Sequence, residues 1–509
     1  MNTPGSLTWF ARHESRLAWR DLMSMMTAGK REREKKVAGG VLIFIGFMHV
    51  VAYFAVGGVR GGTVDVPSLV AITAGVVLSA SAMLSQAMES VTRTFYTRSD
   101  LELILSSPAQ AERLFAVRIG AIAVSVGAMS LAFIGPFVNV LAWRGGAQWL
   151  SAYGLIIAAS LSATALAVVL TATLFQVIGP KRTRTIAQIA AALIGGLFVI
   201  GLQMAALFST GSISRFVYLQ SDYVAAHAPA LNSVLWWPAR AALGDVSALA
   251  NVGAISLALF LLATIIYAPR FAGFAVAASS ISNRTGRTNQ SQRPFRVQSP
   301  VATLRAKERL LLMRDPWLLS QSLMQVLYLL PPALLLWQGY AGGGNGVVVL
   351  APVLVMAAGQ LAGGLAWLTI SGEDAPDLVL TAPVAPMLLL RAKVEAVMQS
   401  IAVVFSPFVV GLLLLSPLTA LIVAGGIGAS AASATAIQLW FRSQAKRSQF
   451  RRRHTSSRIA TFAEALSSIS WAATAAIAAA GSWIAVIVAV LAVGILAVVW
   501  ILSPARAVR

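Results

Sequence analysis

The chain consists largely of apolar runs that are long enough to cross a lipid bilayer. A helix needs about 20 apolar residues to span roughly 30 Å of hydrocarbon, and these runs reach that length with few charges. They are rich in Ala, Val, Leu and Gly and lack the ten-residue alternation of barrel strands. We predict an all-α polytopic membrane protein with about 12 transmembrane helices. The predicted spans lie near 37–58, 66–88, 114–138, 149–178, 186–209, 248–269, 317–338, 347–370, 387–414, 418–441, 459–480 and 482–502.

Composition excludes several classes of protein. Only 11% of the 509 residues are charged, against about a quarter in soluble domains. The chain therefore has too few polar residues to cover the surface of a soluble globular protein. The absence of cysteine excludes disulfides, thiolate nucleophiles and thiolate metal ligands. The four histidines are scattered, so we expect no metal site, no resident cofactor and no catalytic triad. The single Gly29-Lys30 is followed by Arg31 and not by Ser or Thr, so the sequence predicts no phosphate-binding loop and no enzyme activity in this chain.

The basic residues predict the orientation in the membrane. Lys and Arg total 39 against 18 Asp and Glu, and cytoplasmic loops of membrane proteins collect basic residues. With a cytoplasmic N-terminus, only Arg60, Arg144, Arg215 and Arg240 fall on the outside. We therefore expect both termini in the cytoplasm and contacts between the basic loops and membrane lipids, and we expect no nucleic-acid partner.

Loop lengths divide the predicted protein into segments. We expect a cytoplasmic segment with an interfacial helix at 1–36 and a first six-helix bundle at 37–270. A cytoplasmic linker with a second interfacial helix follows at 271–316, then a second bundle at 317–502 and a tail at 503–509. The external loop 211–247 holds Trp236 and Trp237, and we expect a partly helical cap with its indoles at the membrane interface.

Two motifs recur at matching places in the two predicted bundles. Glu14, Arg20 and Asp21 precede the first span, and Glu308, Arg314 and Asp315 precede the seventh with the same spacing. An acid, two leucines, a proline and a base recur after the second and eighth spans, ending in Pro108 then Arg118, and in Pro383 then Lys393. The pattern predicts an internal duplication with two parallel six-helix repeats.

The first motif is typical of a helix lying along the cytoplasmic leaflet. Glu14 and Asp21 are seven residues apart and share a helical face, as do Glu308 and Asp315. This charged stripe is open to two interpretations. It is either a solvated face or a docking surface for basic residues of a partner or of the neighbouring loop.

The second motif resembles that of the permease subunit of bacterial ABC-2-type exporters. Asp100-Leu-Glu-Leu-Ile-Leu-Ser-Ser-Pro108 is similar to the family's Asp-Leu-x-Leu-Leu-Leu-Ser-x-Pro-like loop, and Glu373-Asp-Ala-Pro-Asp-Leu-Val-Leu-Thr-Ala-Pro383 matches it loosely. The family has six spans per half, a cytoplasmic elbow helix and dimeric permeases, so this chain looks like both halves fused.

The resemblance implies that loop helices at 100–107 and 374–382 contact separate ATP-binding subunits and transmit their closure. It implies a bacterial inner-membrane protein with two copies of a soluble ATP-binding subunit per chain, which would bring ATP and Mg. The residues expected to take part in coupling are Asp100, Leu101, Glu102, Leu103, Leu105, Pro108, Asp374, Asp377, Leu378, Leu380 and Pro383. Ala375-Pro376 departs from the motif, which implies unequal contacts in the two halves.

Two ionisable side chains fall inside predicted spans. His49 is interpreted as a packed histidine bonded to a neighbouring helix, with a proton relay as the alternative. Glu464 lies six residues past Arg458, which predicts a place near the cytoplasmic interface, with a charge relay as the alternative. Gln438 is expected to hydrogen-bond between helices.

Together these features predict the membrane subunit of an ATP-driven exporter working by alternating access. The near absence of charges within the spans favours an apolar or amphiphilic substrate such as a lipid or peptide. A secondary transporter is the first alternative and would need His49 or Glu464 for ion coupling. A non-transporting membrane scaffold or regulator is the second.

Overall fold

The computed structural model describes residues 6–27, 34–56, 65–96, 110–210, 228–283, 299–313, 346–371, 381, 383–441 and 458–503. Contacts divide the chain into two compact units, unit 1 at 1–289 and unit 2 at 290–509, which are described separately. Within the described ranges the regular structure is entirely helical. Nine helices there are long and apolar enough to cross a membrane. The described part therefore has the architecture of a helical multi-pass membrane protein.

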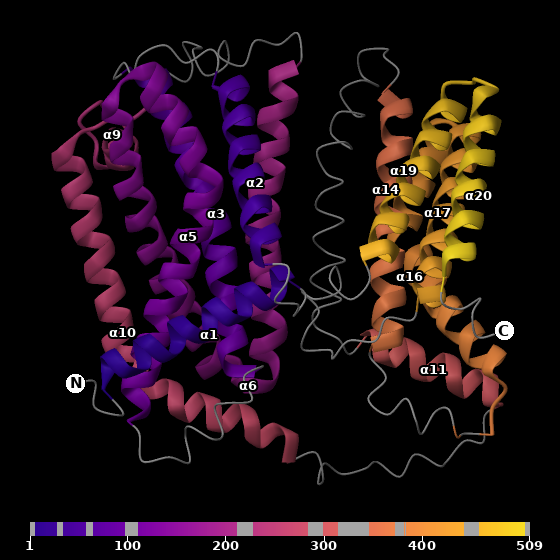
Figure 1. The fold of residues 1–509 in the computed structure, drawn as a ribbon, viewed down its shortest axis with the longest axis horizontal. Helices are drawn as coiled ribbons and strands as arrows, with labels where there is room; N and C mark the ends of the chain where they lie inside the picture. Colours follow the sequence, from indigo (N-terminus) through magenta and orange to yellow (C-terminus); the bar gives the residue numbers. More distant parts are fainter. Residues whose placement is uncertain are drawn as a thin grey trace. The chain divides into compact units, whose positions relative to one another are not determined.

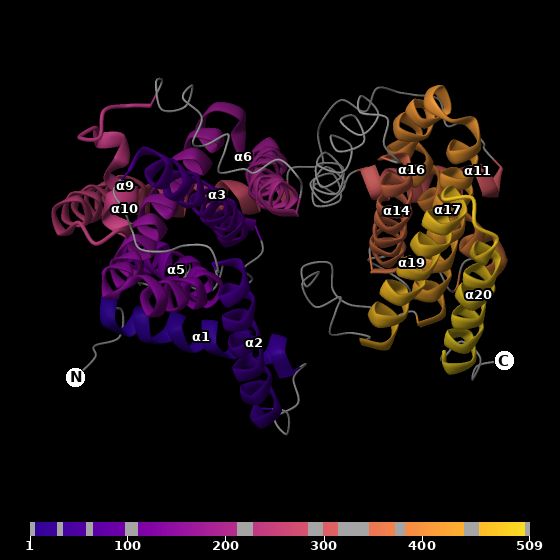
Figure 2. The same ribbon diagram turned by 90° about the horizontal axis from the view of Figure 1, so that it is seen from above.

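Unit 1 contains seven α-helices and two short 3-10 turns in its described part. In order they are α1 (Leu7–Thr27), α2 (Glu34–Ala55), α3 (Val66–Tyr96), α5 (Ala111–Gly145), η2 (Ala147–Leu150), α6 (Ser151–Thr210), η3 (Val234–Trp236), α9 (Trp237–Ala242) and α10 (Val246–Asn283). α1 lies across the bundle helices rather than along them (Figure 1). Seen from above, α5 lies between α1 and the group formed by α3, α6 and α10 (Figure 2).

The core of unit 1 forms around the first half of α6. Ala167, Val168 and Ala172 on this helix are fully buried among residues of α3, α5 and α10. Small side chains let helix backbones approach closely, which is how helices pack when lipid removes the hydrophobic driving force between them. Larger apolar residues such as Phe115 and Phe271 complete this core, while others such as Leu257 and Leu262 are exposed, where lipid can cover them.

α6 contains a break at one residue. The predicted spans 149–178 and 186–209 both fall within it, and Gly179 between them has φ 74° and ψ 168°. Glycine tolerates this left-handed φ, and Pro180 next to it disfavours a helical conformation at the preceding residue. The loop expected between the two spans is thus reduced to a kink.

Unit 2 contains six described helices. They are α11 (Pro300–Met313), α14 (Gly346–Ser371), α16 (Pro386–Leu415), α17 (Pro417–Phe441), α19 (Arg458–Ala479) and α20 (Ile484–Leu502). α14 lies at the centre and packs against α16, α17 and α19, with Trp367 and Leu354 fully buried. α11 lies across the ends of the bundle helices (Figure 1).

The predicted spans correspond to helices wherever the structure describes them. The first predicted span coincides with α2, whose described apolar part Phe44–Phe54 is shorter than the other spans. The span predicted at 317–338 and the loop helices at 100–107 and 374–380 lie outside the described residues.

The cap on the external loop is partly helical, as predicted. The short helix α9 is present, and Trp236 before it is buried against Leu69 and Ala239. Its indole N–H donates to the carbonyl oxygen of Pro229 at 3.2 Å. A buried indole needs a hydrogen-bond acceptor, and the turn before η3 supplies one.

Candidate functional site

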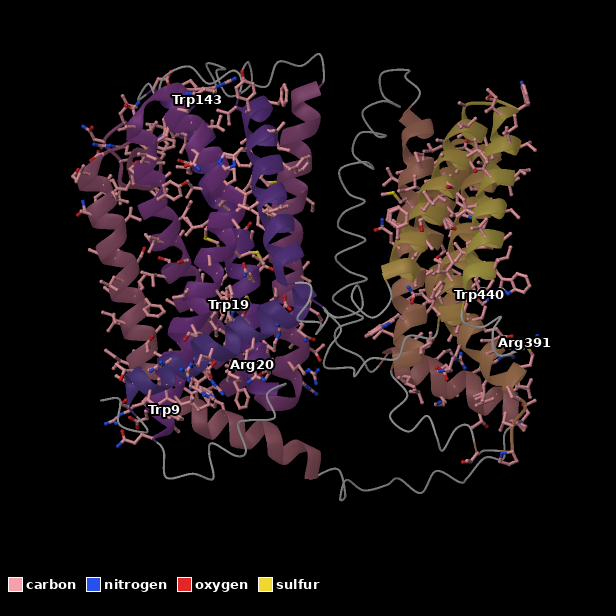
Figure 3. All side chains as sticks on the ribbon, in the orientation of Figure 1. Trp9, Trp19, Arg20, Trp143, Arg391 and Trp440 are labelled. Atoms are coloured by element: carbon pink, nitrogen blue, oxygen red, sulfur yellow. The ribbon has the colours of Figure 1, made fainter. Side chains whose placement is uncertain are left out.

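α1 is held to unit 1 by a buried ion pair. The Ser6 hydroxyl accepts from the backbone N–H of Trp9 and so caps the start of α1. One face of the helix then carries Phe10 and Glu14 into the protein, while Trp9 and Trp19 remain exposed (Figure 3). Arg118 Nε on α5 donates to Glu14 Oε1 at 2.9 Å, and both residues are only 3% exposed. The structure thus places Glu14 in a docking contact rather than on a solvated face.

Unit 2 repeats this contact with a different base. Glu308 on α11 is fully buried, and Lys393 Nζ on α16 lies 3.2 Å from its Oε1. The same amine donates to the carbonyl oxygen of Thr369 on α14. Lys307 Nζ lies 3.5 Å from Glu308 Oε1 on the other side. We call Glu14–Arg118 and Glu308–Lys393 the elbow pairs.

The elbow pairs occupy equivalent positions in the two motifs. Arg118 lies seven residues after the first residue of α5, and Lys393 seven residues after the first residue of α16. Each base also follows its motif proline, Pro108 or Pro383, by ten residues. A charge removed from water costs several kcal/mol unless it is paired, so each pair fixes its cross-lying helix to one place on the bundle.

Unit 2 has a second ionic contact beside its elbow pair. Arg305 on α11 donates through Nη2 to Glu395 Oε1 at 2.9 Å, and Arg391 Nε donates to the same oxygen at 2.8 Å. The hydrogen bonds that Arg305 donates to Glu395, together with the negative charge of that carboxylate, raise the pKa of the Arg305 guanidinium. α11 is therefore attached to α16 at two points.

The remaining motif residues are placed as follows. Arg20 is an exposed residue of α1, Asp21 belongs to α1 but its side chain is outside the described set, and Pro383 is exposed just before α16. The other predicted coupling and stripe residues lie outside the described residues: Asp100, Leu101, Glu102, Leu103, Leu105, Pro108, Asp374, Asp377, Leu378, Leu380, Arg314 and Asp315.

His49 is part of a polar chain that crosses three helices of unit 1. Its Nδ1 lies 2.8 Å from the carbonyl oxygen of Ile45, and its Nε2 lies 3.1 Å from Asn139 Nδ2 on α5. Tyr153 Oη on α6 donates to Asn139 Oδ1 at 2.6 Å. The bond to a neighbouring helix agrees with the packed-histidine interpretation. Asn139 and Tyr153 were not predicted, although an amide within an apolar span is itself a signal of such a contact.

Glu464 is buried among α14, α17 and α19. Gln438 Nε2 on α17 donates to Glu464 Oε2 at 2.6 Å, which is the interhelical hydrogen bond expected of this glutamine. The carboxylate lies directly against Gly363, where an added Cβ would come within 2.1 Å of Glu464 Oε1. Gly359 one turn earlier has Ser430 Oγ and Ser468 Oγ equally close. The two glycines thus make room for polar side chains of two neighbouring helices.

No group of three or more His, Cys, Asp or Glu residues suited to a metal ion is found in the part of the chain that the structure describes. No protein-family model matches the chain, and no curated protein and no solved structure matches it either.

Proposed function

We propose that the chain is the transmembrane permease of an ATP-binding-cassette exporter, with two six-helix repeats fused in one polypeptide. It would lie in a bacterial inner membrane with both termini in the cytoplasm. Two soluble ATP-binding subunits would bring ATP and Mg, and one copy of this chain would form the pathway. The elbow pairs carry this proposal, because in both units a buried glutamate on a cross-lying helix meets a basic residue on the helix after the loop motif.

The elbow pairs suggest how motion would be transmitted. Each loop motif leads directly into α5 or α16, and each base lies about 10 Å along that helix at about 1.5 Å per residue. A displacement of the loop by an ATP-binding subunit would move the helix, and the ion pair would carry the cross-lying helix with it. Differential binding of ATP to the closed subunits would supply the free energy.

The two halves would respond unequally. Arg118 presents a planar guanidinium to Glu14, whereas Lys393 presents a single amine shared with Thr369. Unit 2 adds the Arg305–Glu395–Arg391 contact. This difference agrees with the looser loop motif of the second half.

The test is co-purification from the native membrane in mild detergent. We expect two copies of a soluble ATPase with each copy of the tagged chain, and we expect Glu102→Arg with Asp377→Arg to release them through charge repulsion. Glu112→Arg is the matched control, since this exposed acid in the first turn of α5 lies outside the motif. If no ATPase is found even after crosslinking in intact membranes, the proposal fails, and ion coupling through His49 or Glu464 becomes the next hypothesis to test.

A further inference from the structure

α2 packs against unit 1 mainly through α5. Ala52 of α2 and Val56 just after it pack against Val140 of α5, and most other described side chains of α2 remain exposed. Three cross-helix contacts run beside this line, at Phe44–Phe133, His49–Asn139 and Tyr53–Trp143. The offset between partners stays near 90 residues, so the two helices run parallel. We call this exposed strip the α2–α5 seam.

The deep end of the seam is aromatic. The rings of Phe44 and Phe133 meet edge to face with centroids 5.5 Å apart. They are 38% and 46% exposed, so their outer faces are open to an apolar ligand.

The middle of the seam offers a hydrogen-bond donor. A carbonyl oxygen can only accept, so His49 Nδ1 donates to the carbonyl oxygen of Ile45, and Asn139 Nδ2 lies 3.1 Å from His49 Nε2. The Asn139 oxygen is used by Tyr153. Asn139 is exposed, and its second amide N–H has no acceptor among the described residues. A donor left without an acceptor in hydrocarbon costs free energy, which favours a bound polar group at this point.

The far end of the seam is cationic. Arg144 Cζ lies 3.9 Å from the centroid of the Tyr53 ring, and Trp143 stands beside that ring with centroids 6.2 Å apart. Trp143 lies at the end of unit 1 opposite Trp9 and Trp19 of α1 (Figure 3). No carboxylate of the described residues lies within ion-pair distance of Arg144. Stacking occupies one face of the guanidinium and leaves its N–H groups available to an anion.

We propose that the α2–α5 seam binds an anionic, lipid-like amphiphile. Arg144 and Asn139 hold its headgroup, and its chain lies against Phe44 and Phe133. The distance along α5 from Phe133 to Arg144 is about 16 Å at about 1.5 Å per residue, which accommodates a headgroup and the upper part of an acyl chain. If the chain is an exporter, this amphiphile is the class of substrate that it transports. Only this transport step rests on the proposed function; binding at the seam does not.

The experiment uses the full chain in phosphatidylcholine vesicles without nucleotide. Phosphatidylglycerol with a photoactivatable acyl chain is added, and crosslinked peptides are mapped by mass spectrometry. We expect crosslinks concentrated on α2 and α5. Arg144→Gln combined with Asn139→Leu should lower them at least about tenfold, the effect of losing one charge-assisted contact. Arg144→Lys retains the charge and should retain most of the labelling.

Arg270→Gln is the matched control. Arg270 Cζ on α10 lies 5.8 Å from the Tyr267 ring, so this variant also removes an arginine stacked on a tyrosine, and labelling of the seam should not change. Three results would each overturn the site. They are equal labelling of the seam by a phosphatidylcholine probe, labelling of exposed helices such as α10 as strong as that of the seam, and unchanged labelling in the double variant. Melting temperatures of the variants identify any that fail to fold. The crosslinking experiment contains no ATP-binding subunit, so its result does not depend on ATPase co-purification. Either proposal can therefore fail while the other stands.

Discussion

Glu14 illustrates how a single side chain can determine the position of a helix. α1 has an exposed face with Trp9 and Trp19 that suits a membrane surface, and this face would permit many orientations. The buried carboxylate restricts them, because it is held by the Arg118 guanidinium on α5. Glu308 restricts α11 through Lys393 in the same way.

Arg118→Met should destabilise the full chain by about 3–5 kcal/mol, because it removes the guanidinium that balances the charge of the buried Glu14 carboxylate. Combining it with Glu14→Leu should recover most of that loss, since no uncompensated charge then remains. Thermal unfolding in detergent measures both variants. Glu89→Gln is the control, because it breaks the exposed ion pair with Arg93 and should cost less than about 0.5 kcal/mol. Equal effects at the two sites would contradict a special role for the buried pair.

The sequence predicted which residues form the elbow pairs, but it did not predict which acid pairs with which base. Spacing identified Glu14, Glu308, Arg118 and Lys393 as recurring residues. Which acid meets which base depends on how a cross-lying helix crosses the bundle, and a linear pattern does not contain that angle. Asn139 was missed for a related reason, because its importance comes from His49 on another helix.

At the scale of elements, the apolar runs predicted the helices well because a membrane helix is defined by length and composition. Loops were predicted less well. The break at Gly179 depends on one φ angle, and the inward orientation of Trp236 depends on packing against Leu69. Neither feature changes the amino-acid composition of its segment, so a prediction from composition does not find it.

Asp245 caps the N-terminus of α10. We expect its carboxylate to make the stability of the short helical segment around α9 weakly sensitive to acid. The Ser247 hydroxyl and the backbone N–H of Ala248 donate to its carboxylate, and Arg240 pairs with it at 2.6 Å. These contacts lower the pKa of Asp245 to about 2, whereas an unfolded aspartate titrates near about 3.9. The stabilisation is therefore complete above about pH 4 and is lost as the pH falls toward 2.

Asp245→Asn should reduce the loss of melting temperature between pH 5 and the acid range, because the side chain no longer titrates. Asp245→Ala should cost about 1 kcal/mol at neutral pH through loss of the helix cap. Melting curves of the full chain at a series of pH values measure both effects. An unchanged pH slope in Asp245→Asn would show that the cap does not contribute.

On the scale of the whole molecule, the orientation in the membrane can be tested by labelling introduced cysteines. The chain contains no native cysteine, so no background labelling arises. Gln148 on η2 and Thr303 on α11 are both exposed. A membrane-impermeant maleimide applied to intact cells should label Gln148→Cys, and it should reach Thr303→Cys only after the membrane is opened. The reverse pattern would invert the predicted topology and place the seam's Arg144 in the cytoplasmic leaflet.

The presence of separate elbow pairs in one polypeptide has an evolutionary consequence. In a symmetric dimer, a substitution in such a contact appears in both halves at once, so its cost is doubled. Here the two contacts are encoded separately, and each can drift alone. Arginine in one and lysine in the other are what independent drift would leave. Under the proposed function, one side of such a protein can specialise in transmitting force while the other is retained mainly as a scaffold.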